Sequence, residues 1–366
     1  MLSSLSINQL RNFESLELSL APGVTVFTGA NGAGKTTILD AVHIISTGRP
    51  FSTTSIKSVI QSTKEECTVV GEVRKGDATK LIGVSRNRRG AGQAKIAGTH
   101  VKSLSELAIE LPSVLLTSNV LSALWEGPEA RRKVVDQLMF HVEQQRFVSH
   151  ANNYARAIKQ RNAALRHGIL EASDSWLEAI IESGEAVTAM RGEGVQALAV
   201  ELRSLLDEMN VFLPDWQLTF QQGWSADKDL EQALASVKDK DVQRGFTSVG
   251  PHRADLLVST VHGLASDAFS RGQMKVFMAA LKLAQGRLQC RQSDTSPIFL
   301  VDDVAAELDD THAEAVFRVL DEGQQQVLAT MVDTHQLRRA SLKSLSGLFH
   351  VEHSGSATLI AANQRG

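Results

Sequence analysis

The eight residues from Gly29 to Thr36 have the types and spacing that hold a triphosphate, in the order G-x-x-x-x-G-K-T. An apolar, β-branched run at 24–28 precedes them, and apolar residues at helical spacing follow at 37–46. A strand, a glycine loop and a helix form the context of this motif, in which backbone N–H groups and a helix N-terminus face the anion. Lys35 is expected to reach the β- and γ-phosphates, and the Thr36 hydroxyl to bind Mg²⁺.

The motif therefore predicts a nucleoside triphosphate site. A strand-to-helix turn with additional glycines is the alternative, and eight agreeing positions disfavour it. The expected nucleotide contacts from this stretch are Gly29, Ala30, Asn31, Gly32, Ala33, Gly34, Lys35, Thr36 and Thr37.

A second chemical signal lies at 297–303, where an apolar run ends in Asp302 and Asp303. Such a run is typical of a central parallel strand. Asp302 is expected to hold Mg²⁺ together with Thr36, and Asp303 to polarise the attacking water, a role in which Glu is more usual. A strand that merely ends in an acidic turn would give the same pattern.

Ser270, Gly272 and Gln273 precede apolar residues at helical spacing, so a helix is expected to begin near Ser270. Ser270 and Gln273 also fit a capping box, which would explain the pair without any function. Placed between the P-loop and the Asp-Asp strand, and followed by Ala-Glu-Leu-Asp at 306–309, they instead match the signature and D-loop of ABC-type ATPases. Ser270 then joins Lys35 and Asp303 as a candidate catalytic residue. Gly272, Gln273 and Asp309 become candidate nucleotide contacts.

The order of these motifs implies a dimer. In an ABC head the signature and the P-loop face the same side, so a signature cannot reach the P-loop of its own chain. Two chains are therefore expected to meet head to tail with two ATP molecules between them. The expected cofactors are ATP and Mg²⁺, and hydrolysis would act as a switch that releases the dimer.

The wide spacing between Lys35 and Asp302 separates this chain from compact transporter ATPases and favours the SMC-like branch. The fold class expected is α/β: an ABC-type ATPase head, with a P-loop and mixed sheets flanked by helices, and an inserted, mostly helical second lobe. Residues 1–125 would form the N-terminal half of the head, including a small antiparallel meander between 69 and 97. The helical arm lobe would span 126–244 without sustained heptads, and its helices would be broken at Gly168, Gly184, Gly192 and Gly194. Residues 245–366 would return to the head with the signature, Walker B strand and D-loop.

Further stretches resemble the RecF family: Arg11-Asn12-Phe13 near the start, Gly-Pro-His-Arg-Ala-Asp at 250–255, and an Arg inside the signature. The resemblance covers almost the whole chain and implies that Arg11 and Asn12 lie near the nucleotide. It implies a slow, DNA-stimulated ATPase whose dimer clamps double-stranded or gapped DNA in recombinational repair. RecR is the implied partner, with RecO and RecA in the same pathway, in support of replication and the SOS response.

Three positions depart from the family pattern. Asn119 stands where Glu is frequent, and Ser52 stands where a basic residue is common. Met331 occupies the place of the switch histidine of ABC proteins, so Thr330 or His335 is left to supply that contact.

The formal net charge is −3, so DNA binding must depend on local patches. Residues 71–102 carry eight bases against two acids, and 121–170 carry eight against four, whereas 171–240 are strongly acidic. Aromatic residues make up 5% of the chain, which favours duplex backbone contact over base stacking. The arginines predicted to contact DNA are Arg86, Arg88, Arg89, Arg131 and Arg132.

Two cysteines without a pairing motif indicate a reducing, cytoplasmic location. No apolar run approaches the length of a membrane span, which removes support from the transporter reading. Another SMC-like chromosome or repair ATPase head remains the closer alternative. ATP-induced dimers with raised affinity for duplex DNA would distinguish a RecF-like protein from a transporter ATPase and from another SMC-like head.

Overall fold

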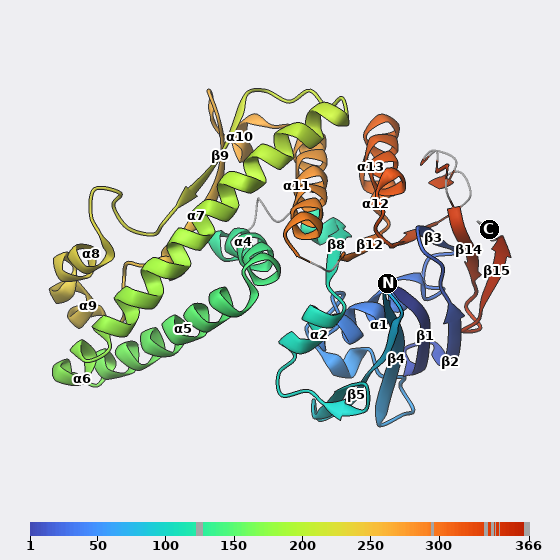
Figure 1. Ribbon diagram of the computed structural model, residues 1–366, viewed down its shortest axis with the longest axis horizontal. Coiled ribbons are helices and arrows are strands. Elements are labelled where there is room, and N and C mark those ends of the chain that lie inside the picture. Colours follow the sequence, from blue (N-terminus) through green and yellow to red (C-terminus); the bar gives the residue numbers. More distant parts are fainter. Residues whose placement is uncertain are drawn as a thin grey trace.

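The computed structural model describes residues 1–121, 127–293, 296–332, 336–337, 340, 342–343 and 345–361. In this part of the chain an α/β head carries a long helical arm, with both described ends of the chain in the head (Figure 1). The fold class predicted from the sequence is therefore confirmed.

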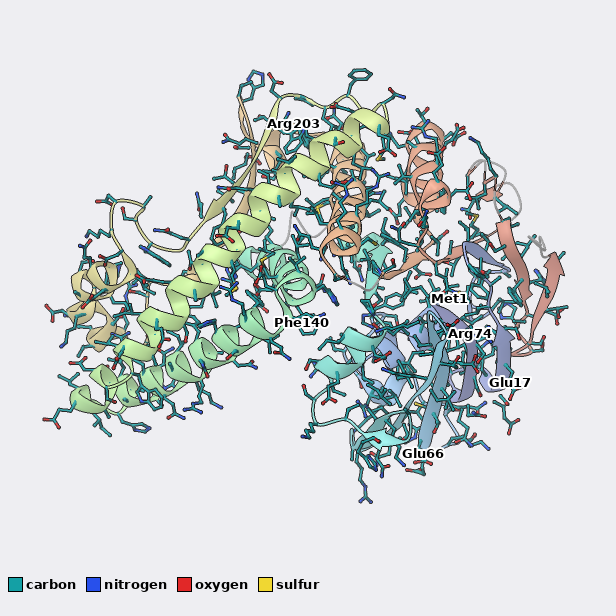
Figure 2. The ribbon with its side chains drawn as sticks, viewed as in Figure 1. Met1, Glu17, Glu66, Arg74, Phe140 and Arg203 are labelled. Atoms are coloured by element: carbon teal, nitrogen blue, oxygen red, sulfur yellow. The ribbon has the colours of Figure 1, made fainter. Side chains whose placement is uncertain are left out.

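The first sheet is antiparallel and has the order β2-β1-β4-β5-β6-β7. The meander predicted between 69 and 97 falls on β4, β5 and β6 of this sheet, which pair in the antiparallel sense. The N-terminal strands extend the same sheet, and the Met1 amino group donates to the Arg74 carbonyl at 2.7 Å (Figure 2). The strands are β1 (Leu2–Leu10), β2 (Phe13–Ser19), β4 (Glu66–Lys75), β5 (Ala78–Asn87), β6 (Gly92–Ile96) and β7 (Thr99–His100).

The second sheet holds the motif-bearing strands in the order β15-β14-β3-β13-β12-β8. Five strands are parallel, and β15 pairs with β14 in the antiparallel sense. Every residue of β3 is buried, as expected where both faces of a parallel sheet are covered. The strands are β3 (Val24–Thr28), β8 (Ser113–Thr117), β12 (Ile298–Asp302), β13 (Val327–Met331), β14 (Leu345–Val351) and β15 (Ala357–Ala361).

The helices of the head cover both faces of the parallel sheet. Helix α1 packs between this sheet and the antiparallel one, while α11 and α13 lie on the opposite face. Helix α11 begins directly after Ser270, as predicted. The helices are α1 (Lys35–Thr47), α2 (Ser105–Glu110), α3 (Ser118–Leu121), α10 (Ala265–Ala268), α11 (Arg271–Gln292), α12 (Val304–Glu307) and α13 (Asp310–Glu322), with 3₁₀ turns at Ile56–Ser58 and Pro251–Arg253.

The arm is built on two long helices, α5 and α7, which run side by side with α6 at the tip (Figure 1). The prediction that glycines break the helical middle is wrong for α7, which continues through Gly184, Gly192 and Gly194. At Gly194 a Cβ would lie 2.2 Å from Met139 Cε, so the glycine allows close approach of a neighbouring helix. The arm helices are α4 (Pro128–Val142), α5 (Gln144–Arg166), α6 (Leu170–Asp174), α7 (Leu177–Glu208), α8 (Leu230–Ser236) and α9 (Lys238–Arg244).

One strand interrupts the region predicted to be helical. Strand β9 (Trp216–Gln221) buries Trp216 and Leu218 on one face, and it pairs with β10 (Asp255–Thr260), which pairs with β11 (Gly263–Leu264). This pairing crosses the predicted boundary between 244 and 245. The division of the chain at 1–125, 126–244 and 245–366 remains our proposal.

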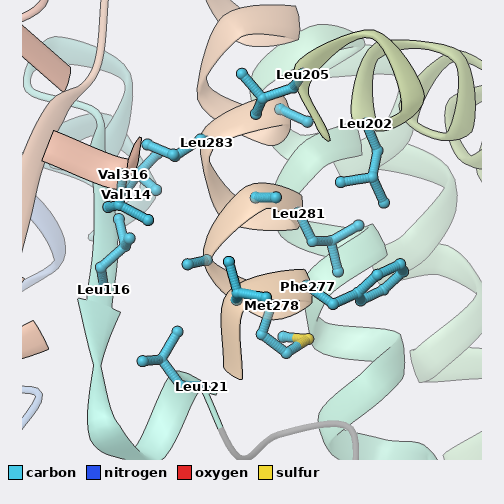
Figure 3. Close-up of a cluster of buried hydrophobic side chains, with 14 of the residues drawn as sticks. Val114, Leu116, Leu121, Leu202, Leu205, Phe277, Met278, Leu281, Leu283 and Val316 are labelled. Atoms are coloured by element: carbon cyan, nitrogen blue, oxygen red, sulfur yellow. The ribbon is translucent and has the colours of Figure 1, made fainter. Parts of the chain in front are cut away.

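One hydrophobic core joins the arm to the head. Leu202 and Leu205 of α7 face Phe277 and Leu281 of α11, and the same core continues to Val114 of β8 (Figure 3). The Trp216 and Phe277 rings meet edge to face, with 5.2 Å between centroids. The base of the arm therefore packs on the signature helix itself.

Candidate functional site

The carboxyl ends of β3, β13 and β12 meet at one edge of the parallel sheet, where Asp302 pairs with Thr330 and Thr330 with Phe27. A cavity of about 470 Å³ opens at this edge. Open α/β sheets bind their ligands outside the carboxyl ends of the strands. The lining residues are Arg11, Asn12, Asn31, Gly32, Gly34, Lys35, Thr36, Thr37, Asp302, Asp303 and Thr330.

The cavity brings together most of the residues predicted to bind nucleotide and metal. Gly29, Ala30 and Ala33 belong to the same loop and contribute backbone carbonyls to it. Four predicted residues do not line the cavity of their own chain: Ser270, Gly272, Gln273 and Asp309. The roles assigned to all of these residues stay predictions.

The P-loop lysine lies inside its own loop. The Lys35 ammonium group donates to the carbonyls of Gly29 at 2.6 Å and Ala30 at 3.0 Å. Burial lowers the pKa of Lys35, and the negative charges of Asp303 and Asp302 oppose that shift. The positive charge of Lys35 therefore lies within the loop that the motif assigns to phosphate binding.

Gly34 lets the Arg-Asn-Phe turn pack against the P-loop. Its φ is +115°, and a Cβ would lie 2.7 Å from Asn12 Nδ2 and 2.8 Å from the Phe13 ring. Asn12 uses that closeness to donate to the Ala33 carbonyl at 2.6 Å. The Asn12 side chain thus holds the Arg-Asn-Phe turn, which was predicted to lie near the nucleotide, against the P-loop.

Asp302 is the centre of a hydroxyl network. Thr36 Oγ1 donates to its carboxylate at 3.0 and 3.1 Å, and Thr330 Oγ1 donates to it at 2.8 Å. Burial raises the pKa of Asp302, while the hydrogen bonds from Thr330 and Thr36 act in the opposite direction. A threonine hydroxyl and a carboxylate that lie this close fit a hard divalent cation such as Mg²⁺.

Asp303 adopts a left-handed conformation, with φ +53°, directly after the strand. Its backbone N–H donates to Thr330 Oγ1 at 3.0 Å. Its Oδ1 is buried and has no hydrogen-bond partner among the described residues. Burial raises the pKa of Asp303, and the neighbouring Asp302 raises it further. A buried carboxylate oxygen without a partner suits a role towards a bound water.

Thr330 is the residue that β13 supplies to the site, from the position beside Met331. Met331 is fully buried in the core and contributes no polar group. His335 lies outside the described residues. Asn119 lines a neighbouring cavity and does not line this one. Of the two residues considered for the switch-histidine contact, Thr330 lines the cavity, and its role there stays a prediction.

Asp40 was missed by the sequence analysis. It is fully buried on α1, one turn beyond Thr36, and its carboxylate forms an ion pair with Arg11 at 3.1 Å. The same carboxylate accepts from the backbone N–H groups of Phe51 at 2.8 Å and Ser52 at 3.1 Å, and from the Ser52 hydroxyl. Arg11 also donates to Ser52 Oγ at 2.5 Å. Asp40 therefore positions Arg11 at the cavity wall.

Asp40→Asn is expected to weaken ATP binding roughly tenfold, because a charge-assisted contact is lost and the new amide N–H₂ faces Arg11. The amide oxygen can still accept from Phe51 and Ser52. If Asp40 acts through Arg11, the double variant with Arg11→Gln should bind ATP no more weakly than the weaker single variant. Equilibrium binding of ATP to the three variants tests this, and additive losses would show that Asp40 has a separate structural role.

The signature and D-loop residues occupy exposed helix starts. Ser270 and Gln273 form the capping box of α11, with hydrogen bonds of 3.2 and 2.9 Å. Asp309 caps α13 by accepting from the His312 backbone N–H at 3.0 Å. Glu307 accepts from Ser118 Oγ at 2.7 Å and from Lys275 Nζ at 2.5 Å, so it joins the end of β8 to α11. Both motifs are thus ordered but apart from the cavity.

Several of the arginines predicted to contact DNA bond to other residues of the chain, and their role towards DNA stays a prediction. Arg88 donates to the carbonyls of residues 61, 62 and 64, at 2.7 to 2.8 Å. Arg131 forms two hydrogen bonds with Asp255, at 2.8 and 2.7 Å, and Arg132 donates to the Ala254 carbonyl. Charge reversal at these positions would disturb the fold, so it cannot test DNA binding.

Fold and site together define the head of an SMC-like ABC-type ATPase. The family model described as "RecF/RecN/SMC N terminal domain" matches residues 1–357. "DNA replication and repair protein RecF" of Pseudomonas syringae pv. tomato is 37% identical over 356 residues, which cover 96% of each chain. The protein of the same description from Pseudomonas entomophila is 36% identical over 355 residues, with the same coverage. The chain belongs to the RecF family.

Solved structures agree on the fold. "Structure of the recombination mediator protein RecF-ATPrS in RecFOR pathway" superposes with a TM-score of 0.85 at 21% identity, over 99% of this chain and 98% of that chain. An Smc head domain from Pyrococcus furiosus superposes with a TM-score of 0.58 at 15% identity, over 98% of this chain and 95% of that chain. Both structures support the fold of an SMC-like head. Among the described helices, none combines the length and apolarity needed to cross a membrane.

Proposed function

We propose that this chain is an ATP-dependent DNA-binding ATPase of recombinational repair that acts as a head-to-tail dimer. The proposal is supported by membership of the RecF family and by a cavity lined with P-loop and Walker B residues. In this proposal Lys35 holds the β- and γ-phosphates, and Thr36 with Asp302 holds Mg²⁺. The ion would neutralise phosphate charge, while Asp303 orients the attacking water.

The observation that carries the dimer is the separation of the signature from the cavity. Ser270, Gly272 and Asp309 belong to well-formed caps, yet none of them lines the nucleotide cavity of their own chain. A second chain that meets the first head to tail would bring its Ser270 and the start of its α11 to the γ-phosphate. The positive end of a helix favours that anion.

Hydrolysis in this proposal is slow, is stimulated by DNA, and serves as a timer. Asp303 is one methylene shorter than the more usual Glu, so its carboxylate must move before it meets the water. We place the work of the dimer at gapped or duplex DNA in the cytoplasm, with RecR as partner and RecO and RecA in the same pathway. A structural relative described as a recombination mediator of the RecFOR pathway supports this placement.

The test of the dimer is sedimentation with ATP or ADP. ATP should convert monomers to dimers, and ADP should not, because only ATP has a γ-phosphate for the opposite Ser270. Ser270→Arg should keep ATP binding while removing the dimer, since the larger side chain replaces the cap of α11. Ser266→Arg is the matched control, because Ser266 is exposed four residues earlier and does not cap α11.

Two outcomes would contradict the dimer. One is a dimer that forms equally well without nucleotide, and the other is an unchanged ATP-dependent dimer in Ser270→Arg. Dimers that fail to bind duplex DNA more tightly than monomers would favour another SMC-like role.

A further inference from the structure

A second and larger cavity borders the nucleotide site. It measures about 970 Å³ and lies between the loop after α1, strands β5 and β6, and the segment before α2. Its charged lining residues are Arg49, Arg86 and Lys102, and none of the lining residues that the structure describes is Asp or Glu. Hydroxyl groups of residues 52–54 and Ser103 complete a surface made largely of donors. We name it the basic cleft.

Arg86 is built into the floor of the basic cleft. Its Nε and Nη2 donate to the Gly48 carbonyl at 3.3 and 3.2 Å, and its Nη1 donates to the Ser85 carbonyl at 3.1 Å. Gly92 makes room for it, since a Cβ there would lie 2.7 Å from Nη1 and 2.1 Å from the Ser85 oxygen. The guanidinium is thus fixed in place before any ligand arrives.

The positive charges of the basic cleft have no Asp or Glu beside them among the described lining residues. Arg49 lowers the pKa of Arg86, after the larger effect of burial, so the two guanidinium groups repel each other. Two carboxylates bond to residues of the cleft, and both are engaged within the chain. Glu106 accepts from the backbone N–H groups of Lys102 and Ser103. Asp40 accepts from Phe51 and Ser52 and forms an ion pair with Arg11. An anion placed between Arg49 and Arg86 would relieve their repulsion, and phosphate oxygens suit the guanidinium donors.

We propose that the basic cleft binds the phosphodiester backbone of DNA. This assignment rests on the proposed DNA binding and gives it a location. Arg86 and Lys102 of the cleft belong to the basic block of residues 71–102, and exposed Arg89 adds a further positive charge at the turn between β5 and β6. Among the described lining residues Phe51 is the only aromatic one, so backbone contact is favoured over base stacking.

The position of the cleft couples it to the nucleotide. Ser52 lines the cleft, and it also bonds to Arg11 and Asp40 of the nucleotide site. A shift of the 49–54 loop by a ligand on either side therefore changes the other site. Reciprocity requires that, if ATP raises the affinity for DNA, DNA raises the affinity for ATP by the same factor.

The test removes two charges from the cleft and two from beside it. The cleft variant is Arg49→Gln with Lys102→Gln, and the control is Lys57→Gln with Lys95→Gln. The control lysines are exposed and adjacent in sequence to lining residues, but they do not line the cleft. Binding of a duplex oligonucleotide is measured with ATP over a series of salt concentrations.

The cleft variant should bind duplex more weakly, with a log–log salt slope reduced by about 0.9 for each lost phosphate contact. The control should retain a slope closer to that of the wild type. Equal salt slopes in both variants would overturn the assignment, because the cleft would then contribute only to the overall positive charge of this surface. A wild type that binds no duplex would overturn the proposed function and this assignment with it.

A free nucleotide is the other source of the same phosphate chemistry. Equilibrium dialysis with ATP should find one nucleotide per chain in the wild type and in the cleft variant. Two nucleotides in the wild type and one in the cleft variant would show that the cleft takes nucleotide, and the assignment to DNA would be wrong.

Discussion

Asp303→Asn is expected to slow ATP hydrolysis by roughly a hundredfold or more, the scale of a lost general base. The amide keeps the shape of the carboxylate but cannot take a proton from water. ATP binding and the dimer should persist, because the backbone N–H of residue 303, which donates to Thr330, is unchanged. A long-lived dimer on DNA would result.

Asp302→Asn is the comparison that distinguishes the role of Asp302 from that of Asp303. Asp302 accepts from both Thr36 and Thr330, so its loss should disturb metal binding, the dimer and hydrolysis together. Phosphate release gives turnover, and light scattering gives the dimer lifetime, for both variants. Wild-type turnover in Asp303→Asn would mean that another group positions the water.

Lys35→Met is the second change with a large expected effect. A charge-assisted hydrogen bond is typically about 1.5–3 kcal/mol, so ATP should bind roughly ten- to hundredfold more weakly. The variant should also lose ATP-dependent dimers, because its methionine cannot donate to phosphate oxygens. Lys35→Arg keeps the charge but changes the donor geometry, so it should bind ATP and hydrolyse it poorly.

Lys57→Met is the matched control for this experiment, because Lys57 is exposed and lies outside the nucleotide cavity. Titration of a fluorescent ATP analogue against the three variants gives the affinities. An unchanged affinity in Lys35→Met would be incompatible with the P-loop assignment.

Local spacing was enough to predict the strands at 24–28 and 297–303, the P-loop helix and the helix after Ser270. Each of those depends on residues that are close in sequence, so pattern and chemistry coincide. Thr330 could not be assigned in this way, because its contact with Asp302 requires the parallel pairing of β12 with β13. The contact is set by register, which the sequence does not display.

The role of Asp40 also depends on contacts with residues that are distant in sequence. An acid within the apolar run of α1 is a visible signal, four residues after Thr36, yet its partners come from residues 11 and 51–52. The prediction of DNA contacts from basic residues has a related limit. Counting charge cannot distinguish Arg88, which is bonded to backbone carbonyls, from Arg49, which faces a cavity.

The packing of α7 on α11 has a mechanical consequence. Arg287 forms two hydrogen bonds with Glu208, at 2.6 and 2.7 Å, and Arg291 bonds to Glu201, so the hydrophobic contact is clamped by ion pairs. At 1.5 Å per residue, the 32 residues of α7 span about 48 Å. A rigid-body turn of α11 by about 10° would swing the arm tip by roughly 8 Å. A small rotation of α11, the signature helix, is therefore expected to cause a large displacement of the arm tip.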